Sequence, residues 1–239
     1  MRSENLPYYL SKHTVSIESG GRKVPIYLSR PTIPDKRPVI IILHEWWGLN
    51  DHVRGIADRY ANLGYVAAAP DLYGGEIAKD RAEAAKLAES VSTDLSTKIL
   101  KSVLDYISIR EFTNQSKIGL HGFCFGGTHA FNFVCESKKI AAAVIFYAGV
   151  LPPKEKLSNI VSPLLIVYGD KDHSIKPDQV HELETTLRKL KKNAQVELYP
   201  DASHAFANET GPNYNEEAAK KAWQEVEKFF GTYLPLPKV

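Results

Sequence analysis

The order of apolar and polar residues along the chain predicts a sheet that starts with a hairpin and continues with buried strands. Apolar and polar positions alternate over residues 13–18 and 24–30, on the two sides of Gly20 and Gly21. This alternation predicts two half-exposed strands at a sheet edge. Short, largely apolar runs predict further strands, most of them buried on both faces, at 39–43, 65–69, 118–120, 141–147, 163–168 and 194–199.

Apolar residues spaced three and four positions apart predict helices between these strands. The predicted helices cover residues 51–63, 80–91, 94–111, 177–191 and 215–233, and another begins after residue 124. In the helix over 215–233, the inner face would consist of Trp223, Val226, Phe229 and Phe230. Strands that alternate with helices in this way predict an α/β protein with a mostly parallel sheet covered on both faces.

The composition indicates one globular domain over residues 1–239 and argues against several classes of function. The chain is 44% hydrophobic and 24% charged, and its 30 basic and 28 acidic residues leave a net charge of +2. Such a balance predicts no basic surface for nucleic acid. The longest apolar stretch, 140–151, is too short to cross a bilayer, and residues 1–13 lack the apolar core of a signal peptide. We therefore expect a cytoplasmic monomer with no membrane contact.

Residues 122–126 have the sequence Gly-Phe-Cys-Phe-Gly, which fits a sharp turn from a strand into a helix. In a nucleophile elbow of this kind the central residue is strained, and the flanking glycines avoid collisions with the neighbouring strand and helix. The helix dipole would favour the thiolate form of Cys124. Taken alone, the pattern fits equally a glycine-rich turn with a buried cysteine. The other cysteine, Cys135, lies too far along the predicted helix for a disulfide and is expected in the core.

Polar residues that follow the predicted strands are the candidates for chemistry, because functional groups gather at the carboxyl ends of parallel strands. The chain order Cys124, Asp172, His204 is the nucleophile, acid, histidine order of the α/β-hydrolase fold. The full set of candidates is His44-Glu45, Asp71, Cys124, Asp170 or Asp172, and His204.

Neither a metal nor another cofactor is expected at these motifs. His44 and Glu45 would start a zinc-binding helix only if a second histidine stood four residues after the first, and Gly48 occupies that position. The glycines of residues 122–127 are not followed by the Lys-Ser/Thr pair of a phosphate-binding loop.

Five stretches, in the right order over nearly the whole chain, resemble the dienelactone hydrolase (carboxymethylenebutenolidase) family of α/β-hydrolases. They are His-Glu-Trp-Trp-Gly-Leu-Asn (44–50), Ala-Pro-Asp-Leu-Tyr-Gly-Gly (69–75), Gly-Phe-Cys-Phe-Gly-Gly (122–127), Gly-Asp-Lys-Asp-His (169–173) and Tyr-Pro-Asp-Ala-Ser-His-Ala-Phe (199–206). The resemblance implies an α/β-hydrolase fold with an antiparallel N-terminal edge and little or no lid. It also implies a hydrolase acting on small esters or lactones.

The resemblance assigns Cys124 as nucleophile and His204 as general base and acid. Asp172 would align the imidazole. Asp170 is the competing acid, and Asp172 is preferred because the family's acid is followed by a histidine, here His173.

The resemblance further implies that the backbone N–H groups of Trp46 and Phe125 form the oxyanion hole. Glu45 would contact the resting thiol until substrate shifts it. A structural ion pair between Glu45 and Arg81 is the alternative. The aromatic residues Trp46, Trp47, Tyr73 and Phe206 could either line an apolar acyl pocket or serve only in packing.

The chain departs from the family at the residues that would bind a substrate carboxylate. Arg81 matches one family arginine, but Ala85 replaces a tyrosine and Asn208 replaces the second arginine. An anion clamp is therefore incomplete. We expect hydrolysis of activated esters or lactones through a thioester intermediate. A broader carboxylesterase or thioesterase with an apolar pocket and a non-catalytic ligand-binding protein remain the alternatives.

Overall fold

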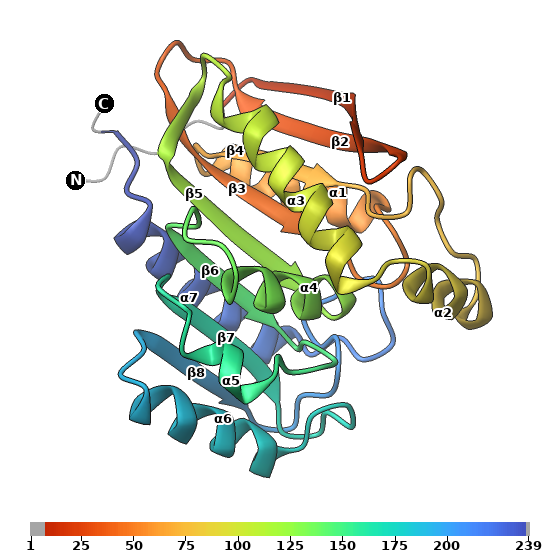
Figure 1. Ribbon diagram of the computed structural model, residues 1–239, viewed down its shortest axis with the longest axis vertical. Coiled ribbons are helices and arrows are strands. Elements are labelled where there is room, and N and C mark those ends of the chain that lie inside the picture. Colours follow the sequence, from red (N-terminus) through yellow and green to blue (C-terminus); the bar gives the residue numbers. More distant parts are fainter. Residues whose placement is uncertain (1–7, 238–239) are drawn as a thin grey trace.

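The computed structural model describes residues 8–237, which contain one eight-stranded sheet (Figure 1). Its strand order is β1-β2-β4-β3-β5-β6-β7-β8. The pairs β1–β2 and β2–β4 are antiparallel, and all other neighbours are parallel. The prediction of a mostly parallel sheet with an antiparallel N-terminal edge is confirmed. The strands are β1 (Leu10–Ser19), β2 (Arg22–Pro31), β3 (Arg37–Leu43), β4 (Val66–Pro70), β5 (Thr113–Phe123), β6 (Ala142–Phe146), β7 (Leu164–Gly169) and β8 (Ala194–Tyr199).

Helices cover both faces of the sheet, as the alternating pattern predicts. In Figure 1, α3 and α4 lie in front of the sheet, whereas α1 and α7 lie behind it. Several helices begin at a residue whose side chain accepts a backbone N–H, as Asn50 does for α1 and Asn215 for α7. The helices are α1 (Asp51–Asn62), α2 (Arg81–Glu89), α3 (Thr93–Ser108), α4 (Phe125–Val134), α5 (Lys154–Leu157), α6 (Pro177–Lys189) and α7 (Glu216–Tyr233).

Three strands extend beyond the apolar runs that predict them, because backbone pairing continues where the side chains are polar. All ten residues of β1 pair with β2, so the hairpin covers 10–19 and 22–31. The strand β5 begins at Thr113, opposite Arg37 of β3, five residues before its apolar part. The four-residue helix α5 lies between β6 and β7, where the apolar pattern predicts no helix.

The core lies on both sides of the central strands. Every residue of β3, β6 and β7 is buried, and the predicted inner face of α7 is buried as well. Cys135 is buried at the end of α4, where burial raises the pKa of its thiol to about 12. Its placement in the core is confirmed.

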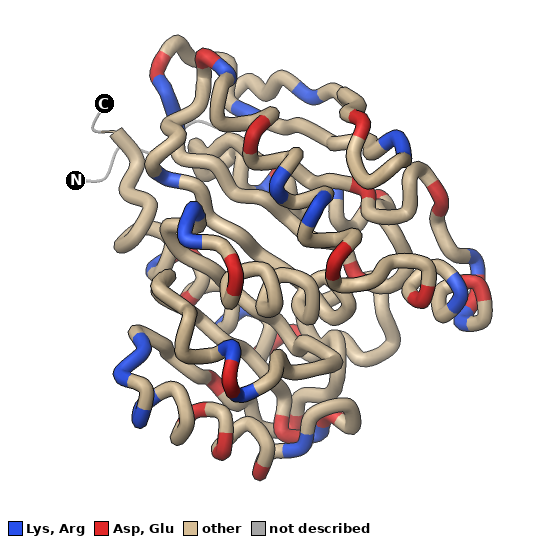
Figure 2. Tube along the Cα trace, in the orientation of Figure 1, with Lys and Arg blue, Asp and Glu red and all other residues tan. Residues whose placement is uncertain are grey.

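Residues of both charge signs are mixed along the trace of residues 8–237 (Figure 2). Figure 2 shows basic and acidic residues intermixed over the sheet edges and the outer helices. Within residues 8–237, no helix has both the length and the apolar character needed to span a bilayer. The carboxyl ends of the parallel strands meet at one edge of the sheet, and the predicted candidates follow them.

Candidate active site

Cys124 occupies a strained turn between β5 and α4. Its φ of 52° and ψ of −114° lie outside the regions that L-residues ordinarily adopt. Two backbone hydrogen bonds hold the turn: the Cys124 N–H donates to the Phe146 carbonyl (3.0 Å), and the Thr128 N–H donates to the Cys124 carbonyl (3.0 Å). The strand–turn–helix context predicted for a nucleophile elbow is therefore confirmed.

The glycines on the two sides of Cys124 are required by close backbone approaches. A Cβ at Gly122 would lie 2.7 Å from Cβ of Ala130, and one at Gly126 would lie 2.5 Å from the His44 carbonyl oxygen. The Gly126 N–H donates to that same carbonyl (3.0 Å). The elbow thus contacts the loop after β3 directly because Gly126 carries no side chain, and the absence of a side chain on Gly122 lets β5 approach α4.

Substituting Gly126 by alanine is expected to lower the free energy of unfolding by about 2–4 kcal/mol, because the new methyl group would overlap two backbone carbonyls. Gly55, in the middle of α1, serves as the matched control, because a Cβ added there would have no other atom within 4 Å. Gly55→Ala should raise stability by about 0.5–1 kcal/mol through helix propensity. Urea denaturation measures both values, and an equal effect of the two substitutions would contradict the packing described for the elbow.

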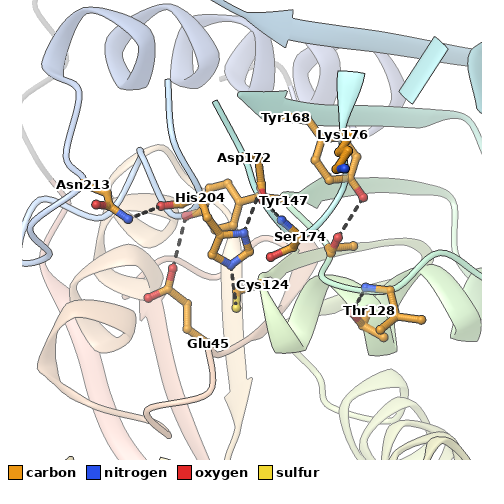
Figure 3. Close-up of polar contacts among 12 residues, drawn as sticks. Glu45, Cys124, Thr128, Tyr147, Tyr168, Asp172, Ser174, Lys176, His204 and Asn213 are labelled. Carbon is orange, nitrogen blue, oxygen red and sulfur yellow. Dashed lines mark hydrogen bonds and ion pairs between the residues drawn. The ribbon is translucent and has the colours of Figure 1, made fainter. Parts of the chain in front are cut away.

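Three residues from separate loops form a continuous hydrogen-bonded line (Figure 3). His204 Nε2 lies 3.0 Å from Cys124 Sγ, and His204 Nδ1 lies 2.8 Å from Asp172 Oδ2. The other Asp172 oxygen accepts the Ser174 N–H (2.7 Å). Asp172, which follows β7, is 3% exposed. The side chain of the competitor, Asp170, makes no hydrogen bond to His204, and its Oδ1 is buried without a partner in the described residues.

The partners of His204 favour its protonated form. Burial lowers the pKa of the imidazole, but the hydrogen bonds to Asp172 and Cys124 outweigh burial and raise the pKa to about 10. The Asn213 side chain donates to the His204 carbonyl (2.9 Å) and holds the backbone of this loop.

The loop after β3 brings the Trp46 backbone beside the start of α4, where Phe125 is the first residue. The Phe125 N–H therefore has no acceptor within its helix. His44, in the loop after β3, donates its Nδ1–H to the Glu45 carbonyl (2.6 Å), and its Nε2 accepts the N–H of Leu72 from the loop after β4 (3.1 Å). The His44 ring also stacks on Phe125. Because burial lowers the pKa of His44, it stays neutral and keeps both contacts.

In the described part of the chain, Glu45 makes neither a hydrogen bond to the thiol, the contact that the resemblance implies, nor the alternative ion pair with Arg81. Its carboxylate accepts the Asn208 side-chain N–H (2.6 Å) and the Tyr147 hydroxyl (3.3 Å). Among residues 8–237 it forms neither a hydrogen bond to Cys124 nor an ion pair with Arg81. The expected contact with the resting thiol is absent because Asn208 and Tyr147 hold the carboxylate while Cys124 Sγ points to His204. Burial raises the pKa of Glu45, although both hydrogen bonds lower it.

A cavity of about 370 Å³ opens beside Cys124 and His204. Trp46, Trp47 and Arg81 line it, as expected. The full lining is Glu45, Trp46, Trp47, Arg81, Cys124, Gly149, Ser174, His204, Ala205, Asn208, Gly211, Pro212 and Asn213. In the part of the chain that the structure describes, no group of three or more His, Cys, Asp or Glu side chains is arranged to hold a metal ion.

Two of the predicted lining residues lie elsewhere. Phe206 is fully buried among Phe146, Tyr147 and Tyr199, so its placement in the pocket is wrong. A loop aromatic can point to either side of its backbone, and here the core offers the larger apolar contact. The Tyr73 hydroxyl donates to the Trp46 carbonyl (3.2 Å), and Tyr73 borders a neighbouring cavity instead.

Tyr147 is a site residue that the sequence analysis missed. It is fully buried with a φ of 36°, it donates to Glu45, and its ring packs edge-on against His204 (5.4 Å between centroids). The signal was present, since residue 147 ends an apolar run at the same sheet edge as Cys124. The apolar run 141–147 predicts a strand that includes this residue, whereas β6 ends at Phe146.

Comparisons with known proteins show the family and the fold of the chain. The sequence profile of the Dienelactone hydrolase family matches residues 24–234. A protein of Aquifex aeolicus named "Putative carboxymethylenebutenolidase" is 31% identical over 229 residues, which cover 92% of this chain and 98% of the relative. The crystal structure of a protein named "Putative Dienelactone Hydrolase" from Klebsiella pneumoniae has a TM-score of 0.87 at 27% identity, covering 94% of this chain and all of that one.

A more distant structure shows the fold alone. The acylaminoacyl peptidase of Pyrococcus horikoshii has a TM-score of 0.74 at 16% identity, with 96% of this chain and 43% of that chain covered. The predicted α/β-hydrolase fold is confirmed by these neighbours together with the sheet order. The match over residues 24–234 shows that the chain belongs to the dienelactone hydrolase family, a family of hydrolases with this fold.

Proposed function

We propose that the protein hydrolyses activated esters or lactones with Cys124 as the nucleophile. The observation that carries the proposal is the line Cys124–His204–Asp172, with distances of 3.0 and 2.8 Å, at the wall of an open cavity. A nucleophile, a base within hydrogen-bond distance and a third group that orients the base are the arrangement needed for acyl transfer. The substrate is a small molecule, in keeping with a cavity of about 370 Å³.

The first half of the reaction forms a thioester. The Cys124 thiolate attacks the carbonyl carbon, and the oxyanion that forms accepts hydrogen bonds from the Trp46 and Phe125 N–H groups. Collapse of this intermediate breaks the ester C–O bond, and the His204 imidazolium gives its proton to the leaving oxygen. Asp172 keeps Nδ1–H of His204 in place throughout.

The second half restores the enzyme. His204, now neutral, takes a proton from water as the water attacks the thioester carbonyl, and the oxyanion is held by the same two N–H groups. Breaking the C–S bond releases the acid and the Cys124 thiolate, while His204 keeps the proton. Because a thiolate leaves more readily than an ordinary alkoxide, attack on an unactivated ester tends to reverse. Aryl esters, enol lactones and thioesters therefore suit this site better.

Trapping the acyl group tests the proposal. Brief reaction with p-nitrophenyl acetate followed by acid quenching should give a protein with one added acetyl group, and peptide mass spectrometry should place it on Cys124. Hydroxylamine at neutral pH should remove it, as expected for a thioester. Turnover of the ester with the acyl group on another residue would overturn the assignment of Cys124.

A further inference from the structure

Asn208 lines the cavity but uses every polar atom of its side chain inside the protein. Its Nδ2 donates to Glu45 Oε2 (2.6 Å), and its Oδ1 accepts the N–H (2.9 Å) and the hydroxyl (2.7 Å) of Thr210. The backbone N–H of Thr210 can only donate, so the atom facing it is Oδ1 and the amide group faces Glu45. At 4% exposure, Asn208 has no freedom to turn toward a bound molecule.

Glu45 is therefore anchored by neutral groups alone. Its carboxylate, 4% exposed, is bound by the Asn208 amide and the Tyr147 hydroxyl. No Lys or Arg of residues 8–237 forms an ion pair with it. An ionised Glu45 repels a second carboxylate, and a protonated one offers it no compensating charge.

Among the described residues that line the cavity, one is a lysine or arginine, and it forms no ion pair with Glu45. That residue is Arg81, the first residue of α2, which is exposed to solvent. The inner wall beside Cys124, formed by Glu45 and Asn208, carries none. A carboxylate at this wall would lose its hydration and meet no lysine or arginine. The positive charge of His204, which also lines the cavity, is already engaged by hydrogen bonds to Asp172 and Cys124.

We propose that Asn208 sets the charge specificity of the site: by holding Glu45 with a neutral amide, it makes the cavity select uncharged acyl groups and lactones over those that carry a carboxylate near the reacting carbonyl. This inference rests on the proposed function for the identity of the reaction. It concerns the wall of the cavity, however, and the wall can be tested without turnover.

The first experiment compares two esters of similar size, p-nitrophenyl butyrate and p-nitrophenyl hydrogen glutarate. The wild-type ratio of kcat/KM should favour the neutral ester by at least about tenfold. Asn208→Arg, which places a cation at the wall, should lower that ratio by about tenfold or more. Glu45→Gln should also lower this kcat/KM ratio, because it removes the carboxylate from the wall. The glutamine amide can still accept a hydrogen bond from Asn208 and donate one to Tyr147.

The second experiment measures the same selectivity without catalysis. The rate of Cys124 alkylation by N-ethylmaleimide is divided by its rate of alkylation by 3-maleimidopropionate. This ratio is then divided by the same ratio measured with 2-mercaptoethanol, which corrects for the intrinsic reactivity of the two reagents. The chain carries Cys135→Ala, so that Cys124 is its single thiol. The quotient should exceed about ten in favour of the neutral reagent and should fall toward one in Glu45→Gln.

The two experiments separate the two proposals. A quotient of one in the wild-type chain overturns the inference, even if both esters are hydrolysed through Cys124. A quotient well above one without hydrolysis of either ester upholds the charge selectivity and overturns the proposed function. If Asn208→Arg does not fold, Glu45→Gln decides the outcome, since glutamine has the size of glutamate and keeps both hydrogen bonds.

Discussion

Cys124→Ala is expected to lower kcat/KM for p-nitrophenyl butyrate by about 10³-fold or more, and the residual reaction would proceed without a thioester intermediate. The substitution removes the sulfur atom that lies 3.0 Å from His204 and leaves the oxyanion donors in place. Alanine has no group that can form a covalent intermediate, so the reaction would need direct attack by water. Steady-state kinetics with both the variant and the wild-type chain measure the loss.

Cys135→Ala is the matched control for this prediction. Cys135 lies at the other end of α4 and is buried, so the same chemical change there should leave kcat/KM within about twofold of wild type. Some stability would be lost with the buried sulfur, and circular dichroism at the assay temperature checks that the control is folded. A rate for Cys124→Ala close to that of this control would remove Cys124 from the mechanism.

The sequence predicts the part of the site in which residue type and chain position limit the possibilities. A strained turn needs glycines on either side, so residues 122–126 predict where the turn stands. Cys124 becomes the candidate nucleophile only together with the acid and the histidine that follow it in the chain. His204 and an acid at 170 or 172 follow because they stand in the loops after the last two strands of a parallel sheet, and the family resemblance then favours Asp172 over Asp170. These positions depend on where the strands of the sheet end, and the apolar runs in the sequence show where the strands lie.

The contacts of Glu45 could not be predicted in the same way. Its two partners stand 102 and 163 residues away in the chain, and nothing in the pattern of apolar residues shows which loops meet. The orientation of Phe206 is a similar case, since the sequence shows an aromatic residue after His204 but does not show to which side its ring turns. Side-chain direction in loops depends on packing between distant segments.

Asp172 is hydrogen-bonded to His204 and Asp170 is not. Substituting each of them by asparagine is therefore expected to have very different effects on kcat. Asp172 Oδ2 accepts Nδ1–H of His204, and its other oxygen is fixed by the Ser174 N–H. Asp172→Asn keeps the shape but replaces one acceptor oxygen by a donor. The imidazole would then turn its unprotonated nitrogen toward the amide, and Nε2 would carry the proton and could no longer accept one.

Asp172→Asn should lower kcat by about 10³- to 10⁴-fold, whereas Asp170→Asn, two residues earlier, should lower it by less than about threefold. The Asp170 carboxylate makes no hydrogen bond to His204, and its buried Oδ1 has no partner among residues 8–237, so a neutral amide costs little there.

The titration of His204 shows whether the loss of activity comes from the histidine or from a general loss of structure. In Asp172→Asn the pKa of His204, raised to about 10 in the wild-type chain, should fall because the carboxylate that stabilises the imidazolium is gone. The ¹⁵N shifts of the His204 ring, recorded against pH, report that fall directly. Equal losses of kcat in the two variants, with an unchanged His204 titration, would show that neither aspartate acts through the histidine.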